Sequence, residues 1–556
     1  MSTRGQPTAR ASAWGPFRSR TIRAMWLAQF VSNVGGWMQT VGAQWLMLSL
    51  TSAAAPVALI QTASSLPVLL FAVPAGAIGD LVDRRRFLLV AQTFMALAAV
   101  ALGLLAIAGV VTPLLLLLLL FALGSGQAWT SPTWQTLQPE LVGPAERPQA
   151  IALGSVNQNL ARAVGPAIGG ALVAAVSVGS VFLINAATFL AVIVVIARWR
   201  GGMRTVGALP REQVGEAVRA GGRYVAASPA LRAILLRAAA FVFFASAIWA
   251  LLPLTARDAL GLGSGGYGLL LGCVGVGAVA GAALLPRLRA SLSPDTMLTI
   301  GSLAVAGLAL VLAYVHVTVL VGVALAIGGM AWILALSTLN SIYQASLPSW
   351  VKARGMGFYL IVFQGGTAIG SAVMGIAAGQ AGLSTTLLAA AIGLVLGPLL
   401  GLRAPFQAIA PDELLPAGDW PAPALADDQA PSGPVMVTVE YWPREELRES
   451  FLAELYDARF SRRRTGASSW RMWRDSGDQS RFLEQFVVAS WQEHLRQHER
   501  VSARDRARLD RIAAMSDAEH QPHVTHWLTP TLPREQPTAI SDERPAGEPQ
   551  PSAPST

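Results

Sequence analysis

A single arginine lies deep inside a long apolar segment, and its charge is unusual for those surroundings. Arg162 comes about a dozen residues into the apolar segment 150–176, which places it near the middle of a membrane at ~1.5 Å per helical residue. A guanidinium that faced lipid at this depth would be costly, so the side chain should face water or protein. Two interpretations stay open. Arg162 either attracts an anion on a substrate pathway or donates to backbone carbonyls and holds helices together.

Polar residues form a stripe along the first apolar segment, at about 22–50. The stripe consists of Gln29, Asn33, Gly36, Thr40 and Gln44. Spacings of three and four residues place these positions on one helical face. Such a face is expected where a helix lines a water-filled cavity, and also where helices bond to one another. On the cavity interpretation, the substrate-pathway residues are Gln29, Asn33, Thr40, Asn159 and Arg162.

The segment that carries Arg162 continues into small residues and one proline, in the run Gly165-Pro166-Ala-Ile-Gly169-Gly170. Small residues let helices approach closely, and proline removes a backbone donor and bends a helix. The run therefore predicts either a bend at a moving interface or close packing without motion.

A short charged turn separates the second and third apolar segments. Its candidate residues are Gly76, Asp80, Asp83, Arg84 and Arg85. Arginines in a short loop mark the cytoplasmic side of a membrane protein. The turn is either part of a gate or only a signal for membrane orientation.

The composition indicates that most of the chain does not face water. Of 556 residues, 53% are hydrophobic and 13% are charged, whereas a soluble domain carries about 25% charged residues. The net charge of +9 comes almost entirely from arginines in loops beside apolar segments, which favours membrane orientation over nucleic-acid binding. Cys273 is the only cysteine, so no intramolecular disulfide is expected.

The elements that must position these residues are membrane-spanning helices. Apolar segments run near 22–50, 56–79, 87–110, 112–137, 150–176, 178–198, 231–256, 264–286, 294–315, 317–343, 355–379 and 382–402. Each approaches the ~20 residues that cross a bilayer, so we predict about twelve spans in two six-helix halves. Basic residues gather on one side, and only Arg257 lies on the other. This skew places both termini in the cytoplasm.

The C-terminal part of the chain predicts a small α+β domain. Its pattern of alternating and helical apolar residues gives the order β-α-β-β-α-β, which is ferredoxin-like. His494 and His498 have a spacing that can hold a metal, but no cysteine or carboxylate completes a site by spacing. We therefore expect a solvated face without metal there, and likewise for His520, His523 and His526.

The predicted organisation combines an all-α membrane protein with this cytoplasmic α+β domain. The predicted parts are a cytoplasmic N-terminal tail 1–20, a six-helix bundle 21–200, a cytoplasmic central loop 201–230, a second six-helix bundle 231–404, a linker 405–434, the ferredoxin-like domain 435–530 and a disordered tail 531–556. No nucleophile, phosphate-binding loop or nucleotide motif is found, so we expect no catalytic residues, no cofactor and no use of ATP.

Three stretches carry a resemblance to a known family. The turn at 74–86 resembles the loop between helices two and three of major facilitator transporters, although Leu81 and Asp83 depart from the family pattern. Gly165–Gly170 resembles the motif on helix five of major facilitator antiporters. Trp26–Gln39 and the turn at 74–86 make about 17–403 similar to the siderophore-exporter branch, which includes enterobactin exporters.

The C-terminal domain has a resemblance of its own. Ser490-Trp491-x-x-His494-x-x-x-His498 is similar to antibiotic-biosynthesis-monooxygenase-like modules appended to some of these transporters. Modules of that type commonly dimerise through their sheets. The resemblance therefore implies possible self-association through this domain.

The family resemblance implies a secondary active transporter and not an enzyme. Such a protein would export a small molecule, a siderophore or a drug-like compound that could be anionic, across the bacterial inner membrane by alternating access. Its partners would be that substrate and the lipid bilayer, without nucleic acid. Proton-coupled antiport is implied by the resemblance alone, because Asp80, Glu140 and Asp258 all lie at span ends. The alternative is a membrane-anchored oxygenase or sensor acting through the C-terminal domain, although an anchor needs one span and not twelve.

Overall fold

The computed structural model describes residues 15–81, 83–143, 146–199, 214–348, 350–399, 406, 417, 433–517 and 519–529. Within these ranges, the side chains of 72–81 and Arg84 are among those outside the description. The chain divides into two compact units, Met1–Leu415 and Pro416–Thr556. The predicted linker 405–434 lies almost entirely outside the described residues, as do the predicted N-terminal tail up to residue 14 and the tail 531–556.

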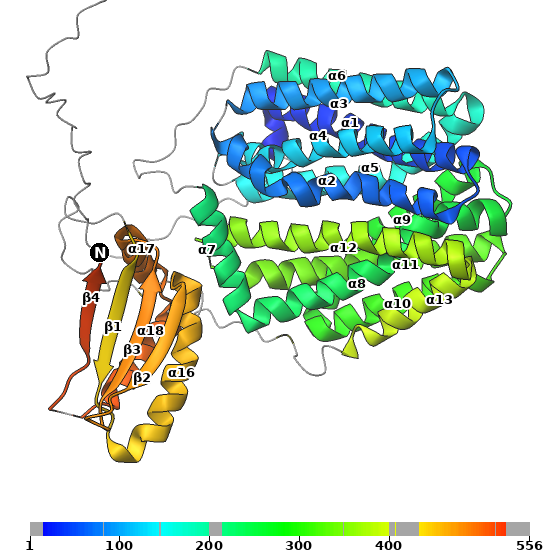
Figure 1. The fold of residues 1–556 in the computed structure, drawn as a ribbon. Coiled ribbons are helices and arrows are strands. Elements are labelled where there is room, and N and C mark those ends of the chain that lie inside the picture. Colours follow the sequence, from blue (N-terminus) through cyan, green and yellow to red (C-terminus); the bar gives the residue numbers. More distant parts are fainter. Residues whose placement is uncertain are drawn as a thin grey trace, which may run out of the picture. The chain divides into compact units, whose positions relative to one another are not determined.

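The first unit consists of long helices that lie side by side (Figure 1). After a short 3-10 turn η1 (Gly15–Arg18), the first group contains α1 (Arg20–Leu50), α2 (Ala54–Leu81), α3 (Arg84–Ile107), α4 (Pro113–Glu140), α5 (Arg147–Ala175) and α6 (Val178–Arg198). The second group contains α8 (Pro229–Leu254), α9 (Ser264–Ser291), α10 (Pro294–Tyr314), α11 (Thr318–Ala345), α12 (Lys352–Ala381) and α13 (Leu383–Leu396). These bounds lie within a few residues of most of the apolar segments found in the sequence.

Nine of the helices formed by the described residues are long and apolar enough to cross a membrane. They are α2, α3, α4, α6, α8, α9, α10, α11 and α12. The prediction of about twelve spans is thus confirmed for nine. The polar stripe makes α1 less apolar although it has 31 residues, and α13 is apolar but has only 14 residues.

Side-chain caps explain why several helices begin where they do. Ser19, Asp83, Thr112 and Ser177 each precede a helix and accept a hydrogen bond from a backbone N–H of its first turn. These N–H groups have no partner inside a helix, so the caps stabilise the helix starts by ~1 kcal/mol each. Short polar sequences between apolar segments therefore set the helix boundaries.

The polar stretch between the two groups contains a helix that the sequence analysis did not predict, α7 (Val214–Ala227). It packs on the start of α12, because Gly221 and Gly222 leave room for Arg354 and Phe358. A five-residue π-helical turn, η3 (Thr255–Ala259), also follows α8.

The two helix groups meet chiefly where α2 packs on α12 and α5 packs on α9, and α2 also packs on α8. Within the first group, α1 packs on α5 and α6, and α3 packs on α6. Within the second group, α9 packs on α11 and α8 packs on α12. Residues of α1, α5 and α9 therefore come together where the two groups meet.

The second unit is a four-stranded antiparallel sheet with helices on one face (Figure 1). Its elements are β1 (Val435–Tyr441), η5 (Glu445–Leu447), α16 (Arg448–Thr465), β2 (Ser469–Arg474), β3 (Phe482–Val488), α17 (Trp491–Arg500), α18 (Ala503–Ala514) and β4 (His523–Leu528). The strand order is β2-β3-β1-β4, with Val437 opposite Phe486 and His526. This is the predicted β-α-β-β-α-β order, except that its second helical region is two helices.

The expectation of a solvated histidine face on α17 is wrong. His494 is 2% exposed, and its Nε2 lies 2.9 Å from Nε2 of His526 and 3.3 Å from Nε2 of His498. The face is buried because sheet pairing brings β4 beside α17, which no spacing in the sequence reveals. Among the residues that the structure describes, no group of three His, Cys, Asp or Glu is arranged to hold a metal ion.

Candidate functional site

Arg162 lies where α1, α5 and α9 meet. Its guanidinium carbon is 5.2 Å from the centre of the Trp37 ring in α1, within the range of a cation–π interaction. A Cβ added to Gly275 of α9 would lie 2.9 Å from the Arg162 carbonyl oxygen. The Arg162 Nε is buried and has no hydrogen-bond partner among the described residues. A cation is thus held at the meeting of the two helix groups without a carboxylate beside it in the described part of the chain.

Arg162 is not the lone arginine inside an apolar helix that the sequence suggested, because Arg237 lies within α8 and its side chain is 3% exposed. Arg237 Nη1 lies 2.6 Å from Oδ1 of Asp295, in the first turn of α10. Its guanidinium also lies 4.0 Å from the Phe406 ring centre, and Asp295 accepts from the Phe406 N–H. Arg237 therefore has an internal counter-charge, whereas Arg162 has none in the described residues.

The polar stripe of α1 shows features of both interpretations, bonding to another helix and lining a cavity. Gln29 donates to Asn33, which donates to Asn157 of α5 at 2.8 Å. Asn157 in turn donates to the Trp26 carbonyl at 2.9 Å. This part of the stripe binds α1 to α5, although the Gln29 Oε1 has no partner among the described residues.

Among the described residues, the side-chain hydrogen bonds of two other pathway candidates stay within their own helices. The Thr40 hydroxyl donates to the Gly36 carbonyl, and the Asn159 amide donates to the Ser155 carbonyl. A Cβ added to Gly36 would meet nothing within 4 Å. This face of α1 therefore adjoins open space, as a cavity-lining face would.

The glycines of the α5 motif face two different neighbours. Cβ atoms added to Gly165 and Gly169 would lie 2.6 Å from the Trp37 Cβ and 2.7 Å from the Met38 Cα. A Cβ on Gly170 would lie 2.6 Å from the Ser264 carbonyl oxygen of α9. The motif, with Pro166 inside the helix, thus lets α5 approach both α1 and the second helix group.

The charged turn is described only in part. Gly76 and Asp80 belong to α2 and Arg84 begins α3, but their side chains are outside the description. Asp83 caps α3 by accepting from the Arg86 N–H at 3.0 Å. Arg85 donates to the Ile196 and Ala197 carbonyls at the end of α6. Both described side chains hold the ends of helices in the first group.

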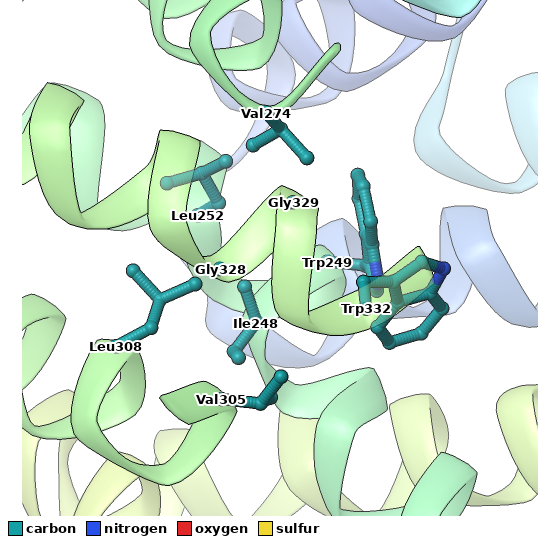
Figure 2. Close-up of a pocket in the computed structure, with 9 residues that line it drawn as sticks. All are labelled: Ile248, Trp249, Leu252, Val274, Val305, Leu308, Gly328, Gly329 and Trp332. Atoms are coloured by element: carbon teal, nitrogen blue, oxygen red, sulfur yellow. The ribbon is translucent and has the colours of Figure 1, made fainter. Parts of the chain in front are cut away.

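A narrow apolar pocket lies inside the second group, between α8, α9, α10 and α11 (Figure 2). Trp249 and Trp332 stand beside each other at one side of it, with ring centres 5.4 Å apart. Its other lining residues are Ile248, Leu252, Val274, Val305, Leu308, Gly328 and Gly329. This lining can contact apolar or aromatic groups but offers no charge for an anion.

The sequence alone does not identify residues whose role depends on a contact with a distant part of the chain. Asn157 and Trp37 are close to predicted residues in the chain, but only the packing of α5 on α1 pairs them with Asn33 and Arg162. Arg237 could have been found, because a second arginine inside the apolar segment 231–256 is visible in the sequence.

Comparison with known proteins gives a family. The sequence profile described as transmembrane secretion effector matches residues 11–534. The enterobactin exporter EntS of Salmonella typhimurium is 27% identical over 362 residues, which are 64% of this chain and 84% of EntS. The staphyloferrin A transporter of Staphylococcus aureus is 28% identical over 160 residues, 29% of this chain. The multidrug efflux pump Tap of Mycolicibacterium fortuitum is 27% identical over 219 residues, 38% of this chain. The chain spans only 40% of the staphyloferrin A transporter and 53% of Tap.

Solved transporters share the fold of the first unit. A bacterial homologue of the human lysosomal transporter Spinster is 15% identical, with a TM-score of 0.55 over 70% of this chain and 97% of that protein. A POT family transporter in complex with 5-aminolevulinic acid is 13% identical, with a TM-score of 0.57 over 71% of this chain and 97% of that protein. The chain belongs to the transmembrane secretion effector family of major facilitator transporters, as the sequence predicted.

Proposed function

We propose that the chain exports a small anionic molecule, a siderophore or a drug-like compound, across the bacterial inner membrane by alternating access. Transport would use antiport and not ATP. The enterobactin exporter and the multidrug efflux pump among its relatives support export. The observation that carries the proposal is Arg162, a cation at the meeting of the helix groups with no carboxylate beside it in the described residues.

The contrast between Arg162 and Arg237 supports this role. Arginines inside membrane proteins pair with another charged group or with backbone carbonyls, and Arg237 pairs with Asp295. Arg162 instead has the Trp37 ring 5.2 Å away, which stabilises a cation without neutralising it. An incoming carboxylate or phenolate would supply the missing charge, and the planar guanidinium can bind it with two parallel hydrogen bonds.

Export per folded molecule tests the proposal in a deletion strain given a panel of anionic siderophores and uncharged drugs. Arg162→Gln is expected to lower export of the anionic substrate about ten- to a hundredfold, because a hydrogen bond to a charged group contributes ~1.5–3 kcal/mol. Arg162→Lys keeps the charge but loses the paired geometry, so its loss should be smaller. Arg219→Gln, at an exposed position of α7, is the matched control. Unchanged export per molecule in both Arg162 variants would leave Arg162 as a structural group.

We also propose that the charged turn forms a gate at the cytoplasmic end, and that both termini lie in the cytoplasm. The gate residues would be Gly76, Asp80, Asp83, Arg84 and Arg85. Asp80→Asn is expected to impair export at normal protein amounts, because Asp80 lies at the end of α2 and α2 packs on α12 of the other group. We likewise propose that the chain is organised in two six-helix bundles, 21–200 and 231–404.

For the second unit we propose self-association or regulation rather than catalysis. Its helices cover one face of the sheet, and the opposite face carries Trp473 and Trp527, which are about half exposed. Exposed aromatic residues on one face favour a protein contact. Trp527→Glu should reduce cross-linked dimers of the full-length protein, and an unchanged dimer fraction would remove this face from consideration.

A further inference from the structure

Gln44, the last residue of the polar stripe on α1, bonds across the two helix groups. The Tyr267 hydroxyl, in the first turn of α9, donates to its Oε1. The Gln44 Nε2 donates to the Trp249 carbonyl of α8 at 3.5 Å. Gln44 is 4% exposed and Tyr267 is 1% exposed. Gln44 is therefore satisfied by the second helix group rather than by water in a cavity.

These bonds lie at one end of the first unit, where α1 finishes and α2 begins, which we call the latch end. Arg257 donates to the Leu48 carbonyl of α1 at 2.8 Å there. Backbones also come close together, because a Cβ on Gly375 of α12 would lie 2.3 Å from the Ala58 Cβ of α2. The structure is thus closed at the latch end.

Separation of the two helix groups would change the hydrogen bonds of the buried Gln44–Tyr267 pair. While the groups are in contact, the tyrosine hydroxyl and the glutamine carbonyl satisfy each other. When the groups part, water takes both partners, so opening leaves neither unsatisfied. Removing only one partner leaves the other unsatisfied in the closed form alone, which shifts the equilibrium toward the open form. Removing both partners leaves an apolar contact that can be close to neutral.

We propose that the Gln44–Tyr267 pair is a latch that sets how often the latch end opens. The proposal rests on transport by alternating access, in which this end must open once per cycle. It assigns Gln44 to the latch and separates it from Gln29, Asn33 and Thr40, which the same stripe would otherwise group with it. Tyr267 is the partner that determines the role of Gln44.

Labelling of an engineered cysteine tests the latch without a substrate. Gly36→Cys in a Cys273→Ala background places the thiol on α1 where an added Cβ meets nothing within 4 Å. A membrane-impermeant maleimide is applied from the side that labels Val110→Cys, an exposed position between α3 and α4. This choice keeps the measurement valid whichever way the protein is inserted.

Tyr267→Phe is expected to speed labelling of the reporter about tenfold, because it leaves the buried Gln44 Oε1 unsatisfied in the closed form. Gln44→Leu is expected to act in the same direction. The double variant Gln44→Leu/Tyr267→Phe is expected to return labelling to near the rate of the reporter protein with Gln44 and Tyr267 intact, which is the parent. Tyr343→Phe is the matched control, because Tyr343 is equally buried but donates to the Gly355 carbonyl inside the second helix group. Its labelling rate should not change.

Three results would overturn the latch. They are a parent-like rate in both single variants, a double variant that labels as fast as the singles, or equal acceleration by Tyr343→Phe. Export measured in the same variants keeps the two proposals apart. If the labelling rates behave as expected but no panel compound is exported, the latch holds and the proposed substrate class fails.

Discussion

At the level of single residues, Glu484 of the second unit is a carboxyl group whose side chain has no exposed surface. Arg462 donates to both of its carboxylate oxygens at 3.0 Å, and Trp470 and Tyr441 donate to the same oxygens. Burial alone would raise the pKa of Glu484, but the charge and hydrogen bonds of Arg462 bring that pKa below its ordinary value. The carboxylate is therefore ionised in the folded unit.

Glu484→Gln is expected to destabilise the second unit by ~3–5 kcal/mol, because it leaves the Arg462 guanidinium buried without a counter-charge. Thermal unfolding of the full-length protein would measure this loss. Glu454→Gln is the control, since Glu454 is paired with Arg508 but is 32% exposed, and such pairs contribute ~1 kcal/mol or less. Equal shifts in the two variants would contradict the assigned role of burial.

The three histidines between α17 and β4 predict a pH dependence of the same unit. Burial lowers the pKa of His494 to about 3 and that of His498 to about 4, with the neighbouring positive charges adding to the effect. The pKa of His526 also lies below its ordinary value because of burial. In the unfolded chain these groups titrate near ~6.5, so the unfolded chain binds more protons. Their contribution to stability is complete above pH ~6.5 and is lost as the pH falls toward the folded values.

The unfolding temperature of the second unit should therefore fall between pH 7 and pH 5. His494→Gln should make the fall smaller, since it removes the most strongly shifted group. The transition of this unit can be recognised as the one that Glu484→Gln moves. A transition that is flat with pH in the unaltered protein would contradict the assignment.

The sequence predicts how deep a residue lies in its apolar segment and which helical face it occupies, but not which distant residue it contacts. The position of Arg162 inside an apolar segment and the shared face of Gln29, Asn33 and Thr40 follow from counting residues. The partner of Asn33 is 124 residues away and that of Gln44 is 223 residues away. Only the folded helices bring these pairs together, so the latch could not be separated from the rest of the stripe beforehand.

At the scale of elements, the contact between α5 and α9 depends on glycines on both helices. A Cβ on Gly170 would lie 2.6 Å from the Ser264 carbonyl oxygen and 2.9 Å from the Gly268 Cα. Both are backbone atoms, so no flexible side chain can move aside. Close approach of the two helix groups here therefore requires the absence of a side chain.

Gly170→Ala is expected to lower export per folded molecule and to reduce stability by ~1–3 kcal/mol, as overpacking does. Gly307→Ala in α10 is the control, because it is exposed and an added Cβ meets nothing within 4 Å. That change should be neutral or slightly stabilising. If both variants behave alike in export and thermal unfolding, close packing of α5 on α9 is not important.

Apolar runs and capping residues made most helices of the first unit predictable, whereas the polar helix α7 was not predicted. The helix α7 was missed because its stretch is rich in arginine and glycine and has no long apolar run. In the second unit, alternation along 435–441 and the strand-like runs 468–474 and 481–489 predicted β1, β2 and β3. The burial of α17 depends on the pairing of β1 with β4, which is a property of the whole sheet.

At the scale of the whole molecule, the arginine skew and the helix order predict which loops share a side. Arg257, the arginine expected on the opposite side from the others, bonds to the end of α1 at the latch end. Val110→Cys, between α3 and α4, should therefore react with an impermeant thiol reagent from outside the cell. Ser291→Cys, at the exposed end of α9, should react only after the cells are opened. The reverse pattern in a Cys273→Ala background would place both termini outside.

We have proposed that this chain moves an anionic substrate by itself and without ATP, with Arg162 as the binding cation. Transport can be measured in liposomes that contain only the purified full-length protein, with equal folded amounts of the unaltered chain and of Arg162→Gln. We expect substrate accumulation that needs no nucleotide and that Arg162→Gln lowers about ten- to a hundredfold. Transport that requires ATP, or that proceeds equally in the two proteins, would contradict it.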